Sequence, residues 1–265
     1  MNTSGTDKIV LLGAGNVATH LGKALRNAGL DILQVYSRSE KSASGLAALL
    51  NCGYTTKYGD IDSEAGLYVI AVTDDAIGEL AKVFPHKGKL VVHTSGSTDM
   101  DVLAPASDRR GVIYPLQTFS RDVEVDFSSV PICLEASKDA DRENLSALAS
   151  RLSDRYEWIS GEQRRVLHIS AVFACNFVNH MYTVSSDLLN RNGLGFDLMV
   201  PLIIETARKA SQGDPSKMQT GPAIRDNRKI MDRHIESLSA DPDYKRMYEI
   251  ISESIRRMHN KDKSI

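Results

Sequence analysis

Small residues whose spacing is typical of a binding site lie near the start of this 265-residue sequence, where Gly13, Gly15 and Ala18 are spaced as G-x-G-x-x-A. The spacing follows a short apolar run, residues 9–12, and precedes a helical pattern, which is the order of a dinucleotide-binding turn. Gly13 would permit the tight turn, Gly15 would let a pyrophosphate approach the backbone, and Ala18 would let the helix pack closely on the strand. Amides at the helix start would then face the phosphates. The residues predicted to hold the pyrophosphate are Gly13, Ala14, Gly15, Asn16 and Val17.

A second polar group follows the next predicted strand, residues 30–36. A site that prefers NAD usually carries Asp or Glu there for the ribose hydroxyls. Here the chain reads Ser37, Arg38 and Ser39. A planar guanidinium binds a phosphate bidentately, and the two hydroxyls can donate as well. These residues therefore predict NADP(H) as the cofactor, with a solvated surface arginine as the alternative interpretation of Arg38.

The carboxyl ends of later predicted strands carry Val72, Thr73, Ser95 and Gln117. If the sheet is parallel, these ends meet at the edge where open α/β folds bind ligands. We predict that the four residues surround the nicotinamide. A polar turn that caps a helix starting at Asp101 would explain Ser95 equally well.

Polar side chains also interrupt an apolar helical pattern over residues 162–192. His168 and Asn176 are eight residues apart, so they share one face of a helix approximately. Burying an imidazole or amide without a partner costs about 1–3 kcal/mol, so we expect such groups to meet a ligand or a polar loop. We predict that both bind substrate and that His168 transfers a proton. A histidine with a purely structural role is the alternative.

Alternating strands and helices position the first groups, and they extend to about residue 160. The predicted strands are residues 9–12, 30–36, 54–56, 67–72, 90–93, 112–114, 131–135 and 156–159. We predict a Rossmann-type, doubly wound, mostly parallel sheet over residues 1–160. Residues 161–265 form the predicted helical domain for substrate binding and dimerisation. Its expected helices are residues 162–192, 198–212, 223–238 and 244–259.

Composition excludes several classes of protein. With 42% hydrophobic and 25% charged residues the chain reads as globular, and a net charge of −2 gives no reason to expect nucleic acid or an anionic membrane as partner. No apolar run approaches about 18 residues, so no membrane span is expected. Cys52, Cys133 and Cys175 are widely separated and lack metal-ligand spacing, so we expect buried thiols, no metal and a cytoplasmic location.

Several motifs together cover nearly the whole chain. Besides the glycine turn and residues 37–39, they are residues 93–96 (HTSG), 115–119 (PLQTF), 171–177 (AVFACNF) and 220–222 (TGP). In this combination the chain resembles a largely uncharacterised family of Rossmann-like proteins with a C-terminal helical domain of unknown function. That family is similar to pyrroline-5-carboxylate reductases, deazaflavin-dependent NADP reductases, ketopantoate reductases and the 6-phosphogluconate dehydrogenase group. The resemblance implies an NADP-dependent oxidoreductase, a second domain like that of 6-phosphogluconate dehydrogenase, and a homodimer formed through its helices.

Two departures from the related families stand out. Hydroxyacid dehydrogenases of this group carry a lysine one turn before the asparagine that matches Asn176, and here Val172 stands at that position. His168, one turn further back, is the candidate to transfer the proton instead. Arg225 could bind a substrate carboxylate or pair with a nearby acid, and residues 225–227 lack the glycine usual in that loop.

We therefore expect an NADP(H)-dependent oxidoreductase that moves a hydride to or from a small carbonyl, imine or alcohol held between the two domains. The alternative is a non-catalytic regulatory protein that binds NADP(H), and the missing lysine favours it. A helical scaffold with a vestigial Rossmann half is disfavoured by the intact glycine turn.

Overall fold

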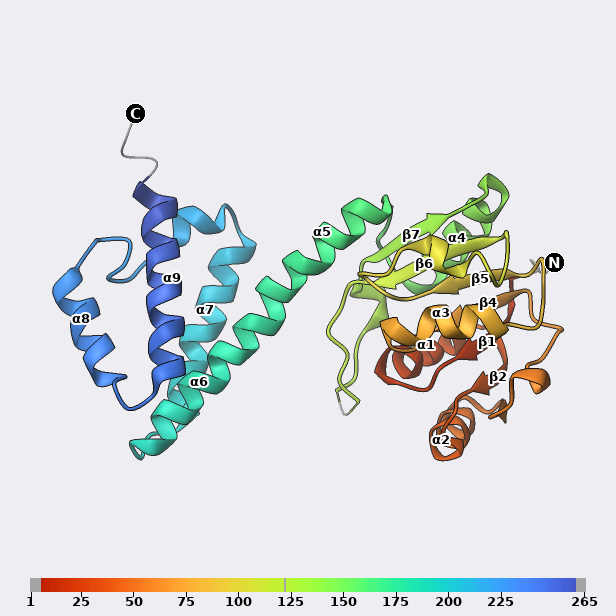
Figure 1. Cartoon of the computed structure of the whole chain (residues 1–265), viewed down its shortest axis with the longest axis horizontal. Coiled ribbons are helices and arrows are strands. Elements are labelled where there is room, and N and C mark those ends of the chain that lie inside the picture. Colours follow the sequence, from red (N-terminus) through yellow and green to blue (C-terminus); the bar gives the residue numbers. More distant parts are fainter. Residues whose placement is uncertain (1–5, 122, 261–265) are drawn as a thin grey trace. The chain divides into compact units, whose positions relative to one another are not determined.

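Apolar strands alternate with amphipathic helices through the first part of the chain, and the strands join one eight-stranded sheet (Figure 1). The computed structural model describes residues 6–121 and 123–260. The strands are β1 Lys8–Leu12, β2 Asp31–Tyr36, β3 Gly53–Thr55, β4 Leu67–Ile70, β5 Leu90–His93, β6 Arg110–Pro115, β7 Ile132–Ala136 and β8 Tyr156–Trp158. Their order is β3-β2-β1-β4-β5-β6-β7-β8, and every neighbouring pair is parallel except β6 with β7. The predicted mostly parallel Rossmann-type sheet is confirmed.

Helices connect the strands and then form the second part of the chain. The α-helices are α1 Asn16–Asn27, α2 Glu40–Leu50, α3 Asp74–Val83, α4 Asp139–Leu152, α5 Gly161–Ala171, α6 Val178–Arg191, α7 Val200–Ser211, α8 Arg228–Ser237 and α9 Pro242–Asn260. A π-helical segment, η4 Val172–Phe177, separates α5 from α6. The short 3-10 helices are η1 Tyr58–Asp60, η2 Met100–Leu103, η3 Phe127–Ser129, η5 Phe196–Met199 and η6 Pro215–Met218.

Helices cover both faces of the sheet, so its strands are buried on two sides. Successive side chains of a strand point to opposite faces. Ile9 and Leu11 of β1 belong to the buried cluster that includes α1, α2 and α4. Val10 and Leu12 belong to the cluster that includes α3 and the region around η2. This double burial explains why the strand sequences are continuously apolar.

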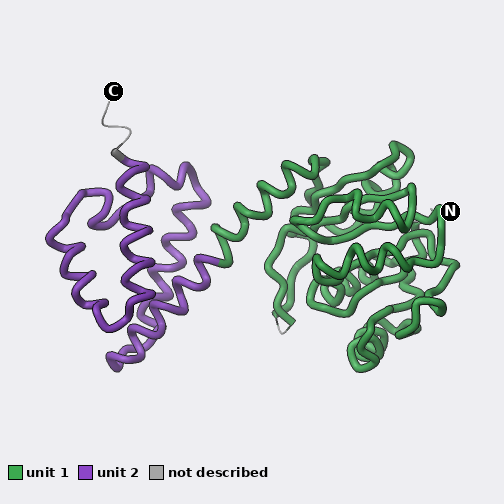
Figure 2. Tube along the Cα trace, in the orientation of Figure 1, with its two compact units in different colours: residues 1–176 green, residues 177–265 purple. Residues whose placement is uncertain are grey.

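The chain divides into two compact units, Met1–Asn176 and Phe177–Ile265 (Figure 2). The division falls inside η4, because α5 packs on the sheet: its Leu167 lies against the cluster formed by Val112, Tyr114 and Cys133. The boundary at residues 160 and 161 stays a prediction. The helix expected over residues 162–192 is present, with the π-helical turn as an interruption that the sequence pattern did not predict.

The second unit consists of helices α6 to α9 and their connections. Polar contacts join α6 to α9 and to the residue before it: the hydroxyl of Tyr244 in α9 donates to Asp187 at 2.9 Å, and Arg191 pairs with Asp241, which directly precedes α9, at 2.6 Å. An apolar cavity of about 290 Å³ lies within this unit, lined in part by Met181, Tyr248 and other large side chains. Across the described residues, no helix has both the length and the apolar character needed to span a bilayer.

Three local expectations were wrong. The helix expected from Asp101 is the four-residue η2, because Pro105 follows closely and cannot continue a helix. The helix expected over residues 223–238 begins at Arg228, because Asp226 has a left-handed φ of 48° and Asn227 caps the helix. Of the three thiols expected to be buried, that of Cys133 is buried, that of Cys52 is half-buried and that of Cys175 is exposed on η4.

Candidate functional site

The glycine turn connects β1 to α1 in a conformation that only glycine tolerates at its first position. Gly13 has a φ of +133°, and a Cβ there would lie 2.1 Å from the Ala71 carbonyl oxygen. Its amide donates to the Tyr36 carbonyl at 2.8 Å. A Cβ on Gly15, in contrast, would meet no described atom within 4 Å. The space above Gly15 is therefore open, beside the unpaired amides that begin α1.

A cavity of about 550 Å³ opens over this turn. It is lined by nine of the residues predicted to bind a dinucleotide: Gly13, Ala14, Gly15, Asn16, Val17, Ser37, Arg38, Val72 and Thr73. These residues come from the ends of β1, β2 and β4, which lie side by side at the centre of the sheet. The strand order reverses between β1 and β4, and ligands bind at such a point in open α/β sheets.

The cavity extends to the end of β2, where Arg38 lines its wall together with Tyr58. The rings of Tyr36 and Tyr58 lie 5.1 Å apart, and burial raises the pKa of Tyr36, so its hydroxyl stays neutral. Ser39 does not line the cavity: it is the N-cap of α2 and accepts a hydrogen bond from the Ser42 amide at 3.3 Å. At the end of this strand the cavity wall therefore carries a guanidinium and hydroxyl groups, whereas the carboxylate in the wall, that of Glu79, comes from α3.

The side chain and the backbone of Asn16 have different surroundings. Its amide nitrogen donates to the Phe119 carbonyl at 2.9 Å, so the side chain holds the loop after β6. Its backbone amide belongs to the first turn of α1 and has no partner within that helix. The backbone of Asn16, not its side chain, is thus available to an anion.

The turn after β5 is organised by Ser95, which is buried and absent from the cavity wall. Its hydroxyl accepts from the amides of Ser97 at 3.1 Å and Thr98 at 2.9 Å, and its carbonyl accepts from Arg164 at 2.7 Å. Gln117 is exposed, and its side-chain Oε1 accepts from the Thr118 amide at 2.8 Å. Neither residue is brought to the cavity in this structure, so their contact with the nicotinamide stays a prediction.

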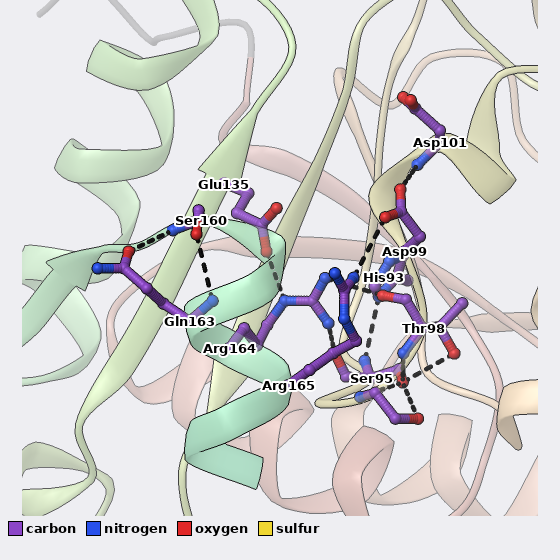
Figure 3. Close-up of polar contacts among 11 residues, drawn as sticks. His93, Ser95, Thr98, Asp99, Asp101, Glu135, Ser160, Gln163, Arg164 and Arg165 are labelled. Carbon is purple, nitrogen blue, oxygen red and sulfur yellow. Dashed lines mark hydrogen bonds and ion pairs between the residues drawn. The ribbon is translucent and has the colours of Figure 1, made fainter.

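Arg164 is fully buried and joins three elements (Figure 3). From α5 it pairs with Glu135 on β7 and donates to the carbonyls of Ser95 and Thr98, the latter at 2.8 Å. Every nitrogen of its guanidinium thus has a partner, which is what a buried charge requires. The arginine fixes the first turn of α5 against the turn after β5. The sequence analysis did not predict this role of Arg164, because the sequence alone does not distinguish it from its exposed neighbour Arg165.

His93 lies beneath this network and is also fully buried. Its Nδ1 accepts from the Ser95 amide at 3.2 Å. Burial, followed by the positive charge of Arg164, lowers the pKa of His93 to about 4. The imidazole is therefore neutral near pH 7 and supports the turn without adding charge.

His168 lies one helical turn beyond Arg164, and its Nδ1 is 3.0 Å from the hydroxyl of Tyr114 at the end of β6. Burial raises the pKa of Tyr114 to about 12, so the phenol is protonated and can donate to the imidazole. Gly96 makes room for both: a Cβ there would lie 2.4 Å from His168 Nδ1 and 2.9 Å from Tyr114. Tyr114 could have been suspected from its place at a strand end on the ligand-binding edge.

Asn176 is exposed on η4, and the described contacts do not include a hydrogen bond between it and His168. π-helical turns often occur at functional sites because they interrupt the regular backbone bonding of a helix. Among the described side chains, no group of three His, Cys, Asp or Glu could hold a metal ion.

Comparisons with known proteins agree with this arrangement. A Rossmann-like domain model matches residues 4–118, and a model of a domain of unknown function, DUF2520, matches residues 130–255. A crystal structure from Bacteroides fragilis, of a protein described as a "putative NADP oxidoreductase", is 45% identical to this chain. The match covers 94% of this chain and 98% of the Bacteroides fragilis chain, with a TM-score of 0.89. The chain belongs to this DUF2520 family of Rossmann-like proteins.

More distant structures share the fold of the DUF2520-family chain. A 1-pyrroline-5-carboxylate reductase of Streptococcus pyogenes is 13% identical, with coverage of 94% of this chain and 98% of its own and a TM-score of 0.62. A pyrroline carboxylate reductase of Plasmodium falciparum with NADP bound is 15% identical, with coverage of 95% and 98% and a TM-score of 0.59. No curated protein matches the chain. The family resemblance inferred from the motifs is confirmed.

Proposed function

We propose that this DUF2520-family chain is an oxidoreductase that uses NADP(H) and acts on a small carbonyl, imine or alcohol. The observation that carries the proposal is the cavity over the glycine turn, with open space at Gly15 and Arg38 at its far wall. These residues fit a phosphorylated dinucleotide, because helix amides suit a pyrophosphate and a guanidinium suits a 2′-phosphate. The description of the Bacteroides fragilis protein and the NADP in the Plasmodium falciparum reductase support the same choice.

The protein would bind and orient the dinucleotide. The amides that begin α1 would hold the pyrophosphate, while Ser37 and Arg38 would hold the 2′-phosphate. Ser39 would support this end indirectly, as the cap of α2. Thr73, with Val72, would lie next to the nicotinamide. When bound, the nicotinamide would supply or accept the hydride.

His168 would hold the proton that balances the hydride. In its protonated form the imidazole carries a hydrogen on each nitrogen: the Nδ1 hydrogen can be donated to the Tyr114 hydroxyl oxygen, and the Nε2 hydrogen can be given to a substrate oxygen or nitrogen, which leaves a neutral ring. Gly96 and the Arg164 network would keep this ring in place. Asn176 would bind a polar atom of the substrate through its side-chain amide.

We also propose that the chain acts as a cytoplasmic homodimer. The side chains of Leu202 and Ile204 on α7 are 61% and 62% exposed, and a second copy would cover them. Cys52, Cys133 and Cys175 are free, which supports a reducing compartment.

A second function deserves a test because Val172 stands where related dehydrogenases carry a lysine. The protein would then bind NADP(H) and regulate a partner without turnover. Incubating the purified chain with NADPH and a panel of small ketones, aldehydes and cyclic imines separates the two proposals. Oxidation of NADPH supports the enzyme, and binding of NADPH without its oxidation supports the regulator.

The first experiment is a titration of the purified chain with NADPH and with NADH, followed by nicotinamide fluorescence. We expect NADPH to bind at least about tenfold more tightly, which is about 1.4 kcal/mol. Arg38→Ala should remove this preference. If neither nucleotide binds the wild-type chain, the proposed function is wrong.

A further inference from the structure

The loop after β6 is attached to the start of α1 by contacts that the sequence did not predict. Asn16 donates to the Phe119 carbonyl, and the His20 ring nitrogen lies 2.9 Å from the Ser120 carbonyl. The rings of His20 and Phe119 stack with centroids 5.1 Å apart, and Phe119 also stacks on Phe127 at 6.1 Å. Residues 119 and 120 therefore have a fixed place beside the glycine turn.

Arg121 follows directly and lies at the turn itself. Its Nη2 is 3.4 Å from the Ala14 carbonyl oxygen, and the side chain lines the cavity over Gly13 and Gly15. The described ion pairs of the chain do not include Arg121. The arginine is exposed, so its guanidinium can adjust to an incoming anion.

The charge around Arg121 also favours an anion. An adjoining hollow of about 540 Å³ is lined by Arg121 together with Lys23 and Lys41. Arg38 also lines the main cavity. These four cations line the two hollows together with one carboxylate, that of Glu79, which pairs with Lys82, so positive charge is in excess there although the net charge of the chain is −2.

We infer that Arg121 binds the pyrophosphate of the dinucleotide and acts as a second phosphate ligand besides the amides of α1. The inference rests on the proposed function. Arg38 lies at the end of β2, whereas Arg121 contacts the glycine turn at Ala14, so the two arginines serve different phosphates. A guanidinium presents parallel N–H donors that match phosphate oxygens.

This division of roles has a measurable consequence. The pyrophosphate is common to NADPH and NADH, whereas the 2′-phosphate belongs to NADPH alone. Loss of Arg121 should therefore weaken both nucleotides by a similar factor, while loss of Arg38 should weaken mainly NADPH. Adenosine 2′-monophosphate, which has no pyrophosphate, should depend on Arg38 and not on Arg121.

The test uses the full-length chain and its variants Arg121→Ala, Arg121→Lys, Arg38→Ala and, as a matched control, Arg155→Ala. Arg155 is exposed at β8 and pairs only loosely with Glu157, at 3.3 Å. Titrations with NADPH and NADH give the dissociation constants, and adenosine 2′-monophosphate is measured as a competitor of NADPH. Unchanged melting temperatures confirm that the variants fold.

In Arg121→Ala we expect about tenfold weaker binding of both NADPH and NADH, an unchanged ratio between them and unchanged competition by adenosine 2′-monophosphate. Arg121→Lys should recover part of the affinity, and Arg155→Ala should equal the wild type. Wild-type affinity in Arg121→Ala, or a loss confined to NADPH, would overturn the inference while leaving the proposed function intact. Failure of the wild-type chain to bind either nucleotide would overturn both.

Discussion

The two compact units of this chain differ in how they bury apolar side chains. Met1–Asn176 contains three buried clusters around the sheet, with strands such as β1 and β4 almost wholly inaccessible. In Phe177–Ile265 the buried side chains among the described residues are those of Ala223 and Met231. Helices α6 and α7 contribute no buried residue. The first unit therefore has a core of its own, whereas the second resembles one half of a core.

This difference shows that a hydrophobic pattern predicts an apolar helix face but does not show whether the surface that covers it belongs to the same chain or to another molecule. The apolar positions of α7 repeat at helical spacing, as those of α1 do, yet only α1 of these two helices has buried residues. Each fully buried aliphatic side chain contributes about 1.5–3 kcal/mol relative to exposure. A unit with so few buried side chains gains that free energy only when another surface, in our proposal a second copy, covers it.

The largest expected effect concerns the first unit. Arg164→Met should remove one partner of the buried pair with Glu135 and lower the free energy of unfolding by about 3–5 kcal/mol, because the carboxylate stays buried without its charge partner. Trp158 of β8, the sole tryptophan of the chain, reports unfolding of this unit by fluorescence in urea. The neighbouring variant Arg165→Met, whose partially exposed pair with Asp99 spans 3.3 Å, should change stability by less than about 1 kcal/mol. If both variants lowered the free energy of unfolding equally, the buried pair of Arg164 with Glu135 would not be the cause of the loss.

The next effect concerns the second unit. Ile204→Asp should place a carboxylate on the exposed apolar face of α7. We expect it to weaken the association of two copies by about 2–3 kcal/mol or more, because the carboxylate would have to lose its hydration at the interface and the apolar contact of Ile204 would be lost. Light scattering at a series of concentrations measures the assembly. Ser211→Asp at the end of the same helix is the matched control and should leave it unchanged. A wild-type chain that is monomeric throughout would contradict the comparison between the two units.

A smaller effect is a pH dependence confined to the first unit. Because the folded-state pKa of His93 is about 4, below the ordinary value of 6.5, the unfolded chain binds a proton that the folded chain does not. The free energy of unfolding should therefore fall as the pH drops, by about 2 kcal/mol between about pH 7.5 and about pH 5. Trp158 fluorescence in urea at each pH measures it. His93→Asn should flatten this dependence, whereas His180→Asn in the second unit should not alter it. A slope that is unchanged in His93→Asn would show that other groups cause it.

Local patterns predicted most of the fold and the residues around the glycine turn. The φ of +133° at Gly13 belongs to a tight turn between neighbouring elements, so the local spacing of the glycines predicts this turn, although the atom that a Cβ would meet there belongs to the distant Ala71. The partners of Tyr114 and Arg164 lie 54 and 69 residues away in sequence, at His168 and Ser95. No local pattern encodes such pairs. The contact of Ser95 with the nicotinamide stays a prediction, and the structure shows the Ser95 hydroxyl bonded within the turn after β5.

The close packing at Gly96 has a consequence for how the family can change over time. A methyl group at this position would overlap the ring of His168 and the phenol of Tyr114, so a larger residue there can be accepted only after one of the two rings has become smaller. Across the DUF2520 family, positions 96, 114 and 168 should therefore vary as a set. Relatives that keep both rings should keep the glycine, and relatives that have lost it mark the point at which this part of the site took on a different chemistry.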